Sequence, residues 1–177
     1  MTHPEHPFPT PREGLMRRVP SGAMVASTAL VTADVYLAKD ATVWFHTVIR
    51  GDDGRISVGE RTNIQDGCIL HCDTGIPLVI GKDCTIGHGA IIHGAKVGDG
   101  VLIGMGSTLL GRSVIGDGAV VAAGSLVKEG FEVPPNTLVA GVPAKIIREV
   151  SEKEQAFMAH AVPHYVETAL SYLPKED

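Results

Sequence analysis

Aliphatic residues recur at every sixth position along most of this chain, and this period is the strongest pattern in it. The run breaks at residues 51–54 and 72–79 and takes one five-residue step before Val97. A period of six fits neither an α-helix with 3.6 residues per turn nor a strand with alternating faces. It predicts a coil of triangular cross-section with one hexapeptide on each side. The aliphatic positions are Val25, Val31, Leu37, Val43, Ile49, Val58, Ile64, Leu70, Ile80, Ile86, Ile92, Val97, Ile103, Leu109, Ile115, Val121 and Val127.

Small or short side chains occupy a second fixed position, four residues after the aliphatic one. We expect both positions to point inward, the large residue along the side and the small one near the corner. Stacked coils then bury a continuous aliphatic core that no single repeat could bury alone. The predicted fold is therefore an all-β solenoid, a parallel β-helix of hexapeptide repeats. The second set is Ala29, Val35, Ala41, Thr47, Thr62, Cys68, Cys84, Ala90, Val101, Ser107, Ser113, Ala119 and Ser125.

The C-terminal part of the chain carries helix signals instead of the repeat. Ser151 and Glu154 have the spacing of a capping box, so we expect a helix to begin there. Pro163 is expected to interrupt it, with a second helical stretch running to about Leu173. The predicted organisation is one domain, made of an N-terminal arm over residues 1–20, the β-helix over 21–148 and a C-terminal helical segment over 149–177.

Composition and charge narrow the class of protein. Hydrophobic residues make up 44% and charged residues 20%, which is typical of a soluble globular chain. A net charge of −5 and the lack of a Lys/Arg run argue against nucleic acid, and no apolar stretch of about 18 residues is present to span a membrane. Three cysteines give no disulfide framework, so we expect a reducing, cytoplasmic location. Cys68 and Cys84 fall on the inward phase, whereas Cys72 is expected to be a free loop thiol.

Three histidines occupy related phases of the repeat. His71 and His93 each directly follow an inward aliphatic residue, and 22 residues separate them. This is one 18-residue turn plus four residues that the break at 72–79 absorbs, so both imidazoles should face outward on adjacent coils. His88 lies two positions after Ile86, near a corner. Three imidazoles with an open fourth position form the ligand set of a catalytic zinc ion.

These histidines lie in segments that resemble the γ-class carbonic anhydrase family, and the resemblance covers roughly residues 20–173. It implies a left-handed β-helix that forms a homotrimer with the metal between subunits. In that family two ligands, here His71 and His93, come from one subunit, and the third, here His88, comes from its neighbour. It implies zinc, with Fe²⁺, Co²⁺ or Ni²⁺ as alternatives, and hydration of CO₂ to bicarbonate by a metal-bound hydroxide. The matching segments are Val48–Asp52, Asn63–Gly67, His71 and Ile86–Gly94.

The resemblance also implies roles for residues around the metal. Gln65 matches the glutamine that orients the hydroxide through its amide. Arg50 and Asp66 match an ion pair across the subunit interface, for which a catalytic role and a purely assembling role both remain open. The other matches are Asp52 as an acidic residue near the glutamine, Asn63 in the pocket, and Tyr165, delivered by the C-terminal helix or else part of the core.

One segment departs from the family pattern. The fully active archetype carries a glutamate proton shuttle in a loop, but the corresponding residues 72–77 contain no glutamate and only one acid, Asp73. Weak activity or a different substrate is therefore one expectation. Two further classes remain open, namely a hexapeptide-repeat acyltransferase that uses CoA, and a trimeric scaffold with a vestigial metal site.

Overall fold

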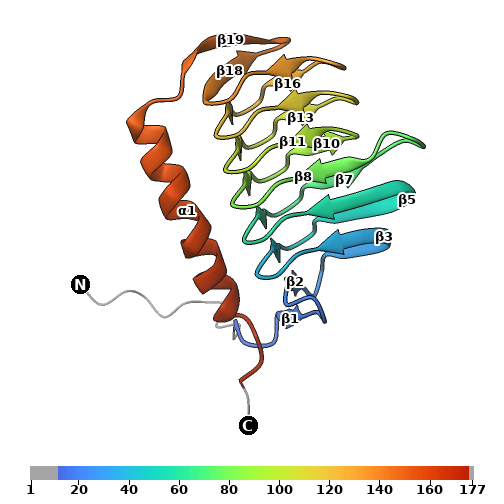
Figure 1. Cartoon of the computed structure of the whole chain (residues 1–177). Coiled ribbons are helices and arrows are strands. Elements are labelled where there is room, and N and C mark those ends of the chain that lie inside the picture. The colour runs from blue at the N-terminus through green and yellow to red at the C-terminus, as the bar shows by residue number, and fades with distance from the viewer. Residues whose placement is uncertain (1–11, 176–177) are drawn as a thin grey trace.

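A computed structural model describes residues 12–175 and shows stacked coils with one long helix beside them (Figure 1). Within this range the strands form a nine-stranded and a ten-stranded sheet. The first sheet contains β1 (Met16–Arg18), β2 (Met24–Ala26), β4 (Thr42–Val43), β6 (Asn63–Ile64), β9 (Thr85–Ile86), β12 (Leu102–Ile103), β15 (Val120–Val121), β18 (Thr137–Gly141) and β19 (Ala144–Glu149). The second runs along the other two sides and contains β5 (Val48–Val58), β7 (Ile69–His71), β8 (Leu78–Ile80), β10 (Ile91–His93), β11 (Lys96–Val97), β13 (Thr108–Leu109), β14 (Val114–Ile115), β16 (Leu126–Val127) and β17 (Glu132–Val133), with β3 (Leu30–Leu37) paired to β5.

The register between coils confirms the six-residue period. Leu138 pairs with Val120 and Val120 pairs with Leu102, in parallel and 18 residues apart. Where the pattern breaks at 72–79 the step lengthens, because Ile91 pairs with Ile69, 22 residues earlier. The extra residues leave the coil as a loop, and the stacking continues on either side of it. The predicted parallel β-helix is therefore confirmed.

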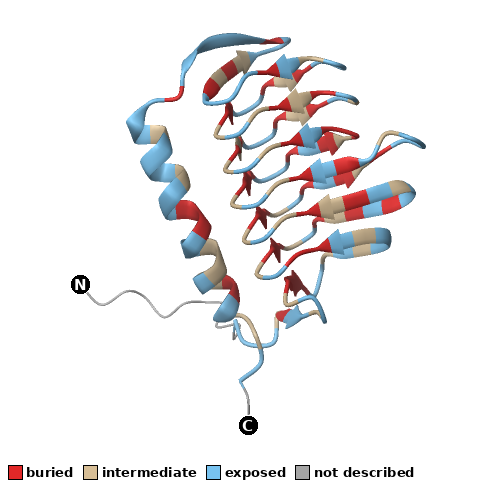
Figure 2. Cartoon of the chain, viewed as in Figure 1, coloured by how far each residue is buried: buried red, intermediate tan, exposed pale blue. Residues whose placement is uncertain are grey.

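The core lies inside the triangle of strands (Figure 2). In β12, β13, β14 and β16 a partly exposed residue precedes a buried one, whereas both residues of β4, β6, β9 and β15 are buried. Aliphatic residues such as Ile64, Ile86 and Ile103 are fully buried, and each contributes about 1.5–3 kcal/mol by leaving water. Glycine after the aliphatic residue lets coils approach closely. A Cβ at Gly104 would lie 2.4 Å from the backbone nitrogen of Ala123 in the next coil.

The helix α1 (Glu152–Leu170) lies against the nine-stranded sheet, where it contacts β4, β6 and β9. Its predicted capping box is present at Ser151, whose backbone N–H donates to Glu154 Oε2 at 2.8 Å. The expected interruption at Pro163 is wrong, because α1 continues through it. Pro163 and Ala159 are both exposed, so the carbonyl that proline leaves without its usual partner faces water.

The three cysteines all lie in the core. Cys68 and Cys84 are fully buried as expected. Cys72 is a free thiol in the loop after β7, as expected, but its side chain is also fully buried. Its sulfur packs over Gly54, where an added Cβ would lie 3.1 Å from it, so the missing side chain at Gly54 makes the room.

The two ends of the β-helix are closed by antiparallel strands. At the start, β1 pairs with β2 and lies within the predicted arm 1–20, of which residues 1–11 fall outside the described part. At the far end, β18 and β19 form a hairpin before α1. Within residues 12–175, no helix is both long and apolar enough to cross a membrane.

Candidate metal centre

His71 and His93 are brought together by strand pairing. They are register partners at the ends of β7 and β10, as their shared phase predicts. Their facing nitrogens, Nδ1 of His71 and Nε2 of His93, lie 3.3 Å apart. Two imidazoles bound at 2.0–2.1 Å in tetrahedral geometry would place their nitrogens about 3.3–3.4 Å apart. The pair therefore has the spacing of two ligands of one zinc-sized ion.

Carboxylates surround this histidine pair. Asp52 Oδ1 lies 3.1 Å from the other ring nitrogen of His71, and Asp53 Oδ2 lies 3.4 Å from it. From the loop after β7, Asp73 Oδ1 lies 3.6 Å from Nε2 of His93. A carboxylate that accepts from the second nitrogen of a ligand imidazole fixes its tautomer and orientation. Asp52, Asp53 and His71 also bring one ligand atom each within 4.8 Å of one another.

Asp52 links the histidines to Arg50. Arg50 Nη1 donates to Asp52 Oδ1 at 2.6 Å, and this bond is the main cause that lowers the pKa of the Asp52 carboxyl. A hydrogen bond from His71 lowers it further. Asp52 therefore stays ionised and holds the His71 ring from the side away from His93.

His88 lies in the turn after β9, where Gly89 adopts a φ of 68° that favours glycine. Its Nδ1 lies 2.8 Å from Asp66 Oδ2, and its ring remains 46% exposed. When Nδ1 donates to Asp66, the lone pair of Nε2 is directed away from Asp66. His88 could therefore offer Nε2 as a ligand on the outside of its own chain.

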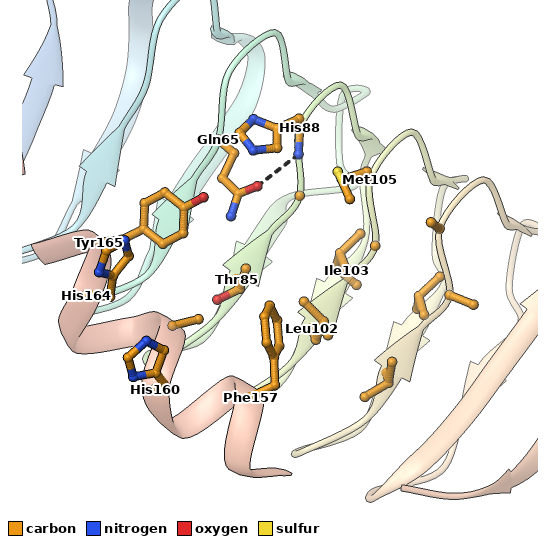
Figure 3. A pocket seen from close by; sticks show the side chains of 17 residues that line it. Gln65, Thr85, His88, Leu102, Ile103, Met105, Phe157, His160, His164 and Tyr165 are labelled. Carbon is orange, nitrogen blue, oxygen red and sulfur yellow. Dashed lines mark hydrogen bonds between the residues drawn. The ribbon is translucent and has the colours of Figure 1, made fainter. Parts of the chain in front are cut away.

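Gln65 is held in place beside His88. Its Oε1 accepts a bond from the His88 backbone N–H at 3.1 Å (Figure 3). Its Nε2 donates to Asn63 Oδ1 at 3.1 Å. Asn63 in turn donates to Thr85 Oγ1 at 2.9 Å. Both amides are buried and point in fixed directions. One proton of the Gln65 amide remains free to donate to a bound molecule.

Tyr165 comes from α1 and faces the same region, with its hydroxyl toward Gln65 (Figure 3). Its ring packs edge-on against Trp44 at a centroid distance of 5.4 Å. Partial burial, and secondarily the negative charge of Asp66, raise the pKa of its hydroxyl. Tyr165 is therefore both part of the packing and a neighbour of the candidate site.

The candidate residues thus fall into two groups in one chain. The His71 half-site contains Arg50, Asp52, Asp53, His71, Asp73 and His93, and the His88 half-site contains Asn63, Gln65, Asp66, His88 and Tyr165. Among residues 12–175, neither a hydrogen bond nor an ion pair joins the two half-sites. Arg50 and Asp66 accordingly have different partners within the chain, and their pairing between subunits stays a prediction.

Sequence reasoning missed two residues near the site. Asp53 stands beside Asp52 in the break of the repeat, and that position was the only signal for it. Trp44 follows the core residue Val43, and nothing in its spacing indicates that it would pack against Tyr165.

A β-helix of six-residue repeats with imidazoles on its outside places this chain among the left-handed hexapeptide-repeat proteins. Two family models agree, "Bacterial transferase hexapeptide (six repeats)" over residues 94–129 and "Hexapeptide repeat of succinyl-transferase" over residues 77–110. The "Carbonic anhydrase" of Geobacillus kaustophilus is 43% identical over 162 residues, which cover 92% of this chain and 89% of that protein. This chain belongs to the γ-class carbonic anhydrase family.

Other relatives support the same assignment. The "Probable carbonic anhydrase" of Methanocaldococcus jannaschii is 40% identical over 84% of this chain and 95% of that protein. "Gamma carbonic anhydrase 2, mitochondrial" of Arabidopsis thaliana is 40% identical over 85% of this chain, which spans only 56% of that longer protein. A solved structure of a putative acetyltransferase from Bacillus cereus matches with a TM-score of 0.79 and 42% identity, over 84% of this chain and 90% of that one.

Proposed function

We propose that this protein is a metal-dependent carbonic anhydrase that hydrates carbon dioxide to bicarbonate as a homotrimer. One observation carries the proposal, namely that the chain presents two complementary half-sites, each incomplete by itself. The His71 half-site offers two imidazole nitrogens at 3.3 Å, and the His88 half-site offers a third, oriented by Asp66. A three-fold assembly would place the His88 of one chain against the His71 half-site of the next.

An apolar ladder supports this assembly. Leu30, Val48, Ile69 and Ile91 stack in register on the outside of β3, β5, β7 and β10. Leu30, Ile69 and Ile91 are 56%, 48% and 41% exposed in the single chain, a continuous apolar strip of the kind that marks an interface. His71 and His93 end two of these strands, so a chain that covers the ladder would also approach the histidine pair.

The donor set fits zinc, since three neutral imidazoles and an open position are its usual catalytic ligands. Fe²⁺, Co²⁺ and Ni²⁺ also accept imidazole, so the same residues would hold them. The bound ion would supply Lewis-acid activation of water near neutral pH. Asp52 and Asp66 would keep His71 and His88 oriented toward it through their second ring nitrogens.

The remaining residues would position the reactants. The free amide proton of Gln65 would orient the water molecule, because the rest of that side chain is fixed by His88 and Asn63. Tyr165 would border the same space with its hydroxyl. Arg50 uses only one of its guanidinium nitrogens, Nη1, in hydrogen bonds to the described residues. Its other donors would be available to Asp66 of the adjoining chain.

The three free, buried cysteines support a reducing compartment such as the cytoplasm.

Metal analysis and stopped-flow CO₂ hydration with a pH indicator test the proposal. The purified protein is expected to hold close to one metal ion per chain and to hydrate CO₂, while His71→Ala loses both. A metal-loaded trimer without activity would instead indicate a scaffold with a vestigial site. A metal-free protein that transfers the acetyl group of acetyl-CoA to an amine or hydroxyl acceptor, with release of the CoA thiol, would indicate the acyltransferase class. This class is the second candidate because the matching Bacillus cereus structure is that of a putative acetyltransferase.

A further inference from the structure

An apolar groove lies between α1 and the outer face of the nine-stranded sheet (Figure 3). Its volume is about 450 Å³, within the range of small-molecule sites. Leu102 and Val120, which are register partners on β12 and β15, form its floor, and Phe157 of α1 stands over it. The side chain of Phe157 is 55% exposed in this position, so α1 leaves apolar surface uncovered here.

The described residues that line the groove carry no negatively charged side chain. His160 and His164 lie one helical turn apart on α1, and their rings stack at a centroid distance of 5.8 Å and an angle of 19°. Among the described residues that line the groove, none is aspartate or glutamate. An apolar floor with two parallel imidazoles at its edge is complementary to a hydrocarbon chain that ends in one anionic group.

We propose that this groove binds an amphipathic monocarboxylate, with its hydrocarbon chain on Leu102, Val120 and Phe157 and its carboxylate on His160 and His164. The site requires neither the metal ion nor CO₂ hydration, so it stands or falls separately from the proposed enzymatic activity. Gln65 and His88 form the other end of the groove, and the ligand head is placed away from them.

Isothermal titration of the zinc-loaded protein with butyrate, hexanoate and octanoate tests the apolar floor. Complete burial of one methylene is worth about 0.8 kcal/mol, or roughly fourfold in affinity. Because the groove is open, each methylene is only partly buried and contributes part of that energy. The dissociation constant is therefore expected to fall about two- to fourfold for each added methylene. Equal constants across the series, or no binding of octanoate at millimolar concentration, would overturn the proposal.

Variants then locate the two ends of the ligand. Leu102→Trp fills the groove and is expected to weaken octanoate at least tenfold, and Phe157→Ser, at an exposed position, about fivefold. The double variant His160→Ala/His164→Ala is expected to weaken octanoate about tenfold but leave neutral octanol unchanged. Leu170→Ser, at another exposed apolar position of α1, is the matched control and should bind like wild type.

One further variant separates this site from the metal centre. His71→Ala is expected to keep octanoate binding, because the proposed carboxylate position lies on α1. If His71→Ala lost octanoate binding while His160→Ala/His164→Ala kept it, the carboxylate would lie on the metal and the proposed site would be refuted.

Discussion

Mixing two inactive variants tests whether each metal site is shared between chains. His71→Ala removes one half-site and His88→Ala removes the other, and each homotrimer is expected to lose at least 100-fold in activity because two imidazoles hold the ion poorly. In a mixed trimer, a site is intact where a His88→Ala chain supplies His71 and His93 and its neighbour, a His71→Ala chain, supplies His88. With random 1:1 assembly each requirement is met half the time, so about a quarter of the sites are restored.

The assay is CO₂ hydration after the two variants are unfolded, mixed, refolded together and supplied with zinc. The matched control is a mixture of His71→Ala with His93→Ala. These two lesions fall in the same half-site, where the ring nitrogens lie 3.3 Å apart, so no mixed trimer contains an intact site. About 25% of wild-type activity in the first mixture and none in the second is expected. Equal activity in both mixtures, or none in the first, would refute the sharing of ligands between chains.

Three other predictions follow from the packing. Ile91→Lys places a charge in the apolar ladder and is expected to convert the proposed trimer to monomers in light scattering coupled to gel filtration; an intact trimer would contradict the proposed interface. Trp44→Ala removes a ring that is 5% exposed and is expected to lower the free energy of unfolding by about 3–5 kcal/mol in urea titrations, whereas a loss below 1 kcal/mol would show that the cluster with Tyr165 is not part of the core. Burial raises the pKa of the Cys68 thiol to about 11 and that of Cys84 to about 12, so both should resist a thiol reagent at pH 8 until the protein unfolds. Because these thiols ionise at lower pH in the unfolded chain, stability should fall as the pH rises above about 9, and a flat profile there would contradict their burial.

The six-residue period predicted most of the fold because each core position repeats the same physical demand. Ile86 and Ile103 are inward in successive coils for the same reason, so a one-dimensional pattern is sufficient to place them. The same phase argument placed His71 opposite His93, since a residue directly after an inward position points outward. These inferences needed only the spacing along the chain and the rule that stacked coils align.

The six-residue period does not predict the burial of Cys72 or the continuity of α1 at Pro163, because both depend on contacts outside the repeat. Cys72 lies in a break of the repeat, and its burial depends on the missing side chain at Gly54, eighteen positions earlier. Pro163 is predicted to interrupt the helix, but the exposed turn around it lets water replace the missing bond, and α1 packs on β6 and β9 as one continuous helix. Such local compensation depends on neighbours that are distant in sequence.

The position of His88 follows from the same geometry and has a consequence for assembly. His88 precedes His93 by five residues, almost one full side of the triangle, so the coil turns a corner between them. His88 therefore lies across a corner from the paired His71 and His93, and the proposed site would take its third ligand from a second chain. If the ion binds only at the assembled interface, metal binding and trimerisation are thermodynamically linked. Removing the metal with a chelator should then weaken the trimer, and adding Zn²⁺ should restore it, whereas a trimer of unchanged stability would mean that the apolar ladder alone carries the assembly.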